Sequence, residues 1–323
     1  MDRRERVFAA MDRKPVDRVP VGFWYHFGGG DKFPADICEK HVQYVKDTNL
    51  DMIKVMCDGY FPYPFEVKPK TPADFRAMQP LGAHHPFIEG QVERAKRIMD
   101  LAGKDYPVFY NVFAPFSSLR FGAGDGEVMA ALGEDPLSVM QALDTVGYDN
   151  ATLTERLIRE AGVDGVYYCV QGGEKSRFTE EQYDTFIRPS DLYVLERAQR
   201  YSDYNILHCC GWAGDGNRME LWRDYPVKAV NWAVYVEKMP LTAGREFFGN
   251  KCCVGGFESL HRNGGLMNTG VIHEGTKEEI QAFTKKTIAD FGKTGLILGA
   301  DCTIDNRIDH EHIRWVVEAT ETA

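Results

Sequence analysis

Two stretches decide the fold: GVYYCV at residues 165–170 and NILHCC at residues 205–210. Each is a short, mostly apolar run, and the first is rich in β-branched and aromatic residues. Several runs of this kind are apolar on both faces, which is the pattern of a strand buried on both sides of a sheet. The segments between such runs have the spacing of amphipathic helices. Alternation of buried strand and amphipathic helix predicts a parallel α/β sheet.

Eight such runs occur along the 323-residue chain. They cover Val19–Trp24, Asp51–Met56, Pro107–Phe113, Gly165–Val170, Asn205–Cys210, Ala229–Trp232, Cys252–Gly255 and Leu296–Ala300. Eight strand–helix units favour a closed (β/α)8 TIM barrel over an open doubly wound sheet. The open dinucleotide-binding sheet would need G-x-G-x-x-G after its first strand, and the triplet Gly28-Gly29-Gly30 lacks that spacing.

The rest of the chain fits a single barrel domain over residues 1–323, since no linker or repeat divides it. Residues 1–15 are predicted to form an extra helix before the barrel. Thr276 and Glu279 make a capping box ahead of a helix over Lys277–Phe291, which Gly292 ends. Residues 132–162 are predicted to be helical with a break at Gly147.

Charge and composition exclude several classes of function. The chain has 38 Lys plus Arg against 48 Asp plus Glu, a formal net charge of −10, which argues against nucleic acid or an anionic membrane as partner. The N-terminus is charged, with no apolar run behind it, and no run approaches the ~18 apolar residues of a membrane helix. We therefore expect a soluble, cytoplasmic protein. Its eight cysteines are too sparse for a disulfide scaffold and are expected to be thiols, metal ligands or core residues.

The motif His208-x-Cys210 is the strongest candidate for chemistry. Alternation along a strand places both side chains on one face and Cys209 on the other. In a barrel, functional groups gather at the C-terminal ends of the strands, where Cys302 follows the last strand. One imidazole and two thiolates suit zinc and leave a fourth position open for a substrate. The alternative is that these cysteines fill the core as small hydrophobic residues.

Asp58 is the second candidate, an acidic residue at the end of the second predicted strand. It can bind a cationic or hydrogen-bonding group of a substrate, or it can cap the loop together with Gly59. Other side chains at strand ends are predicted to contact the substrate. They are Trp24, Tyr25, His26, Tyr60, Gln171 and Asn231.

Six segments of the chain resemble the uroporphyrinogen decarboxylase superfamily. They are RRERV (3–7), PVDRVPV (15–21), GGE (172–174), FTEEQY (178–183), LHCCG (207–211) and ILGADCTI (297–304). The resemblance covers nearly the whole chain and implies a (β/α)8 barrel, in agreement with the eight predicted strands.

Two branches of this superfamily imply different functions. True uroporphyrinogen decarboxylases need no cofactor and hold a polycarboxylate tetrapyrrole with an arginine-rich element after the first strand. The matching stretch here, FWYHFG at residues 23–28, has no arginine. Methylcobamide:coenzyme M-type methyltransferases carry an H-x-C motif and a distant cysteine as zinc ligands, a pattern similar to His208, Cys210 and Cys302.

The resemblance therefore implies a zinc-dependent methyltransferase of a corrinoid system. A methyl group would pass between methylcobalamin on a partner corrinoid protein and a small thiol or a methylated substrate. One alternative is a cofactor-free decarboxylase of a small carboxylated substrate, with Asp58 as its catalytic residue. A non-catalytic barrel, in which the cysteines only pack, is the other.

Overall fold

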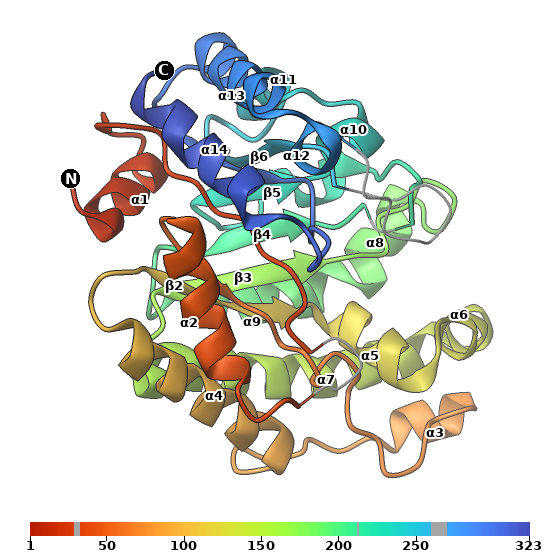
Figure 1. Ribbon diagram of the computed structural model, residues 1–323. Helices are drawn as coiled ribbons and strands as arrows, with labels where there is room; N and C mark the ends of the chain where they lie inside the picture. The colour runs from red at the N-terminus through yellow and green to blue at the C-terminus, as the bar shows by residue number, and fades with distance from the viewer. Residues whose placement is uncertain (29–32, 212, 260–269) are drawn as a thin grey trace.

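The computed structural model describes residues 1–28, 33–211, 213–259 and 270–323 (Figure 1). Gly29 and Gly30 of the glycine triplet lie outside the described residues. The strands are β1 (Ile53–Val55), β2 (Val108–Phe113), β3 (Gly165–Val170), β4 (Ile206–Cys209), β5 (Ala229–Trp232), β6 (Cys252–Phe257) and β7 (Leu296–Ala300). They form one curled sheet in the order β1 to β7, and every neighbouring pair is parallel.

Helices surround the sheet in Figure 1. The first seven are α1 (Arg3–Met11), α2 (Ile37–Thr48), α3 (Pro72–Arg76), α4 (Pro86–Ala102), α5 (Pro115–Ala123), α6 (Asp125–Glu134) and α7 (Pro136–Arg156). The next are α8 (Glu180–Phe186), α9 (Arg188–Gln199), α10 (Val234–Glu237), α11 (Leu241–Phe247), α12 (Val271–Glu274), α13 (Lys277–Phe291) and α14 (His310–Glu321). A π-helical turn at Leu157–Ala161 and a 3-10 turn at Met219–Trp222 complete the set over the described residues. None of the described helices is both long and apolar enough to cross a membrane.

The parallel α/β architecture predicted from the sequence is confirmed, but the eighth strand is not formed in the described residues. Within Val19–Trp24 only Val21 makes a bridge, to Leu298 of β7. Pro20 has no N–H to donate, and the N–H of Val21 donates to the Asp51 carboxylate, so the ladder toward β1 does not develop. The sheet is therefore a curled seven-stranded one, and the segment over residues 20–22 lies beside it without being a regular strand.

Backbone contacts nevertheless tie this segment to both edges of the sheet. The Gly22 N–H donates to the Leu298 carbonyl at 2.8 Å, and the Asp51 N–H donates to the Val21 carbonyl at 2.9 Å. Gly299 permits the close approach on the β7 side, because a Cβ there would lie 2.6 Å from the Gly22 carbonyl oxygen.

Two layers of buried apolar side chains pack against the two faces of the sheet. The larger lies between the strands and the surrounding helices, and the smaller fills the concave side. The smaller layer includes Met52, Phe109, Tyr167 and Ile297, together with Val7 and other residues of α1. The predicted extra helix thus covers the end where the strands begin, and polar side chains gather at the other end.

The predicted helix over Lys277–Phe291 is confirmed as α13, including its capping box at Thr276 and Glu279. The predicted break at Gly147 is wrong, because α7 runs through it from Pro136 to Arg156. A Cβ on Gly147 would lie 3.7 Å from both the Pro115 side chain and the Ser190 carbonyl, which is ordinary van der Waals contact, so neither space nor backbone conformation sets this position apart within the helix.

Candidate metal centre

His208 lies on the concave face of β4, only 2% exposed. Its Nδ1 is 2.5 Å from Oδ1 of Asn231 on β5, directly opposite it in the sheet register. The Asn231 amide nitrogen donates to the carbonyls of Val254 and Ala300 at 2.9 and 3.1 Å, so its oxygen must be the acceptor. The proton of the imidazole therefore sits on Nδ1, and the lone pair of Nε2 is free to bind a metal.

Cys210 follows β4 by one residue and its side chain is buried among polar partners. Its backbone N–H still bonds to the Val170 carbonyl at 3.2 Å, which continues the ladder. The Gln171 side chain lies near the Cys210 sulfur and counteracts part of the rise in the pKa of that thiol. The Gln171 oxygen accepts from the buried Arg120 guanidinium at 2.7 Å, which fixes which end of the amide faces the thiol.

Cys302 comes two residues after β7 and completes the cluster. Its N–H donates to the Ser259 hydroxyl at 3.0 Å, and its sulfur lies 3.5 Å from Nε2 of His208. The ligand atoms of His208, Cys210 and Cys302 all lie within 4.8 Å of one another. The structure thus brings together three residues that are up to 94 positions apart in the chain.

The two thiols share a proton. The hydrogen bond from Cys210 holds the pKa of Cys302 well below its ordinary value, against the effect of burial. The same hydrogen bond, together with burial, raises the pKa of Cys210 well above its ordinary value. Cys302 is therefore the sulfur of the pair that loses its proton first.

This donor set fits zinc. Soft thiolates with one neutral imidazole are the ligands that zinc prefers, and a three-ligand set leaves an open fourth position, as in catalytic zinc sites. The hydrogen-bonded partners Asn231 and Gln171 are the kind of outer contacts that orient metal ligands.

The predicted substrate residues divide between two places. Gln171 and Asn231, expected to touch substrate, lie behind the metal-ligand candidates and contact them. Asp58 is 5% exposed and accepts hydrogen bonds from the backbone N–H groups of Phe27 and Gly28, while its other oxygen lies 2.7 Å from Nδ1 of His26. Burial raises the pKa of Asp58, but His26 and these backbone groups outweigh it and lower the pKa overall.

A cavity of about 310 Å³ opens beside this Asp58–His26 pair. It is lined by His26, Gly28, Asp58, Gly59, Phe61, Pro62 and Phe121. Tyr60 instead packs against Phe33 and Phe87 outside this cavity, under the Arg94 guanidinium. Tyr25 packs on Phe27 and Tyr44.

Trp24 is buried, and its ring lies against the ammonium group of Lys54. Lys54 is not among the site residues predicted from the sequence. Lys54 stands between Met52 and Met56 on the concave face of β1. A lysine at an inward-facing position of an otherwise apolar strand is the sequence signal that would have identified it.

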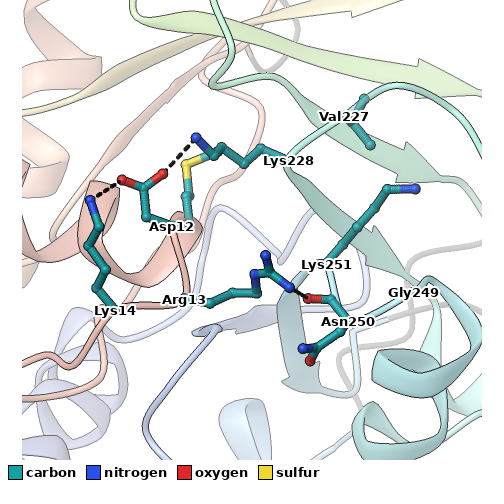
Figure 2. Close-up of a pocket in the computed structure, with 9 residues that line it drawn as sticks. Asp12, Arg13, Lys14, Val227, Lys228, Gly249, Asn250 and Lys251 are labelled. Atoms are coloured by element: carbon teal, nitrogen blue, oxygen red, sulfur yellow. Dashed lines mark hydrogen bonds and ion pairs between the residues drawn. The ribbon is translucent and has the colours of Figure 1, made fainter.

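A second pocket of about 450 Å³ lies at the opposite end of the sheet, at the starts of β5 and β6 (Figure 2). Four cationic side chains line it. Lys14 and Lys228 pair with Asp12, whereas Arg13 and Lys251 donate to the backbone carbonyls of Asn250 and Arg223. Its distance from the strands' C-terminal ends separates it from the candidate metal centre.

The architecture and this centre define a parallel α/β protein with a candidate metal site at the carboxyl edge of its sheet. The sequence profile of the family described as "Uroporphyrinogen decarboxylase (URO-D)" matches residues 56–323. The chain belongs to this family, as the resemblance predicted. No curated protein sequence matches the chain significantly.

Solved structures share the fold at low identity. A methyltransferase from Methanosarcina mazei has a TM-score of 0.73 and 15% identity, covering 100% of this chain and 99% of that one. A putative vitamin-B12 independent methionine synthase from Listeria monocytogenes has a TM-score of 0.57 and 13% identity over 95% and 98% of the two chains. A GH5_18 protein from Streptomyces cattleya, in complex with GlcNAc, has a TM-score of 0.54 and 14% identity over 94% and 80%. At these identities the likeness concerns the fold alone.

Proposed function

We propose that the protein is a zinc-dependent methyltransferase of a corrinoid system. A methyl group would move between a cobalamin on a partner corrinoid protein and a small thiol or methylated substrate. The observation that carries this proposal is the convergence of His208, Cys210 and Cys302 within 4.8 Å. When bound there, zinc would supply the Lewis acidity that keeps a substrate thiol deprotonated at neutral pH.

The protein's own residues prepare this site in two ways. Asn231 holds the His208 ring with Nε2 unprotonated, and the Arg120–Gln171 pair orients the Cys210 sulfur. The shared proton of the two thiols leaves one thiolate ready to bind a cation. A preset tautomer and a preset thiolate reduce the rearrangement that metal binding requires.

Two observations favour this function over a cofactor-free decarboxylase. The Asp58 carboxylate already takes hydrogen bonds from Phe27, Gly28 and His26, which is the arrangement of a loop-holding group. The stretch at residues 23–28 has no arginine to hold a substrate carboxylate. We also propose that the protein is cytoplasmic. We propose further that the segment over residues 20–22 closes the seven-stranded sheet into a barrel.

Metal analysis of protein purified without added zinc tests the proposal. We expect about one equivalent of zinc in the unmodified protein and a large loss in Cys210→Ser. Cys209→Ser is the matched control, because Cys209 belongs to the layer on the other face of the same strand. Less than about half an equivalent in the unmodified protein, or full retention in Cys210→Ser, would contradict the proposal. Assays with methylcobalamin and candidate thiols or methyl ethers then identify the substrate.

A further inference from the structure

Lys54 is a buried cation whose recorded partners are two aromatic rings. It is 6% exposed, and its Nζ lies 3.9 Å from the ring centroid of Tyr167 and 4.5 Å from that of Trp24. No hydrogen bond or ion pair joins it to any residue in the described part of the chain. Cation–π contacts offset only part of the loss of water around an ammonium group, so this position is costly without an anion.

The surroundings of Lys54 hold two more unsatisfied polar atoms. The indole N–H of Trp24 and the hydroxyl of Tyr167 are buried and have no hydrogen-bond partner. A lysine with a purely structural role would be expected to face a carboxylate, as Arg6 and Arg18 face the buried Asp51. Among the described residues, no carboxylate pairs with Lys54 in this way.

This charge lies close to the candidate metal centre. The Tyr167 ring, which contacts Lys54, is 5.9 Å from the His208 ring, centroid to centroid. The ammonium group is therefore separated from the candidate metal centre by the Tyr167 ring alone, close enough for its charge to act on a ligand bound there.

The charges of the proposed site determine what this lysine can balance. A divalent cation with two thiolates and one neutral imidazole has no net charge, so the metal and its three ligands would leave the charge of Lys54 unmatched. An anionic ligand at the open fourth position would neutralise it, whereas a neutral ether or thioether would not. On the proposed function, we infer that Lys54 is a charge-balancing residue that makes the site select the thiolate of a small thiol over a neutral methylated compound.

This assignment gives methyl transfer a direction. Binding the thiol releases its proton to solvent. Attack by sulfur forms the S–C bond while the Co–C bond breaks, with the bonding pair left on cobalt. The product is a neutral thioether, which no longer balances Lys54. The residue therefore favours binding of the thiol and release of its methylated product.

The test compares zinc-loaded unmodified protein with Lys54→Met, which keeps an unbranched side chain of similar length. The probes are 2-mercaptoethanol, its S-methyl thioether and azide, measured by titration calorimetry between about pH 6 and 9. We expect Lys54→Met to weaken binding of the thiol and azide roughly 10- to 30-fold and to move the thiol-binding curve to higher pH. Thioether binding is expected to change less than about twofold, and zinc content to stay the same.

Two controls make the outcome specific. Lys54→Arg keeps the charge and is expected to keep the preference for anionic ligands. Lys251→Met removes a lysine at the opposite end of the sheet and is expected to change none of these affinities. Equal weakening of thiol and thioether in Lys54→Met, an unchanged pH curve, or no binding of either anion to the unmodified protein would overturn the inference. Failure of the proposed function would appear earlier, as a lack of zinc before any ligand is added.

Discussion

Asp51 and Lys54 are three residues apart in the chain, but only one of them has its charge neutralised by neighbouring side chains. Asp51 is fully buried and accepts hydrogen bonds from Arg6, Arg18 and the Val21 N–H, all at 2.8 Å. Lys54, three residues further on, contacts two aromatic rings and pairs with no carboxylate among the described residues. The carboxylate of Asp51 is therefore paired with arginines, whereas the ammonium group of Lys54 is paired with no carboxylate among the described residues.

The pocket in Figure 2 extends the same contrast. Its cations lie at the end where the strands begin, and two of them share the Asp12 carboxylate. At the other end, His208, Cys210 and Cys302 face one another with no cation among them. The difference indicates that the beginning of the sheet serves stability and that its carboxyl end is prepared to receive a ligand, as is usual in barrel-like α/β folds.

Asp51→Ala tests the first half of this contrast and has the largest expected effect. It leaves two arginines without their buried partner, so we expect a loss of about 3–5 kcal/mol in the free energy of unfolding. Urea unfolding followed by circular dichroism measures it. Asp17→Ala, which removes a more exposed partner of Arg6, should cost under about 1 kcal/mol. A loss as small for Asp51→Ala as for Asp17→Ala would contradict the structural role.

Asn231→Ala tests the second half. It removes the acceptor that fixes the His208 tautomer, so we expect zinc affinity to fall roughly 10- to 100-fold. It also leaves the Val254 and Ala300 carbonyls without their donor, so we expect a loss of about 1–3 kcal/mol in the free energy of unfolding. Competition with a chelator of known affinity measures it. Asn231→Asp keeps an oxygen at this position and is the matched control, expected to retain most of the affinity. Equal losses in both variants would show that the hydrogen bond does not orient the ring.

The shared proton of Cys210 and Cys302 predicts a pH dependence for zinc uptake. The lowered pKa of Cys302 and the raised pKa of Cys210 leave one thiolate and one thiol near neutral pH. Zinc binding should therefore release about one proton, and affinity should rise about tenfold per pH unit. Calorimetry in two buffers of different ionisation enthalpy counts the protons, and a release of two would show that the thiols are independent.

Asp12→Asn has the smallest expected effect. Burial raises the pKa of Asp12, but Lys228 and Lys14 outweigh it, so the folded-state pKa is lowered. The stabilisation is therefore present above the ordinary carboxyl pKa and disappears as the pH falls through the folded-state pKa. We expect Asp12→Asn to reduce stability by less than about 1 kcal/mol at pH 7, and we expect this loss to shrink as the pH falls through the folded-state pKa. A larger loss, or one independent of pH, would mean that the pocket does more than pair surface charges.

Much of the fold follows from local sequence pattern. Six of the seven observed strands begin within one residue of their predicted starts. A run that is apolar on both faces is stable only where both faces are buried, as in the middle of a covered parallel sheet. The exception is β1, which begins two residues later than predicted, at Ile53, after the buried carboxylate of Asp51. The failure at Val19–Trp24 has a long-range cause, since that same carboxylate takes the Val21 N–H.

The metal-ligand candidates of the site could be predicted from the sequence, but the residues that contact and orient them could not. His208, Cys210 and Cys302 are recognisable by residue type and spacing, as chemistry restricts which side chains hold zinc. Asn231 and Gln171 were expected at substrate, and only the packing of neighbouring strands shows that they contact the ligands instead.

The sequence by itself determined the alternation of strand and helix, the family, and which side chains can serve as metal ligands, since periodicity and donor chemistry are local properties. The tertiary structure alone decided that these ligand candidates meet within 4.8 Å and that Lys54 faces the same interior with no carboxylate partner in the part of the chain that the structure describes. Distances between residues far apart in the chain are set by strand register and sheet curvature. A local pattern fixes neither of them.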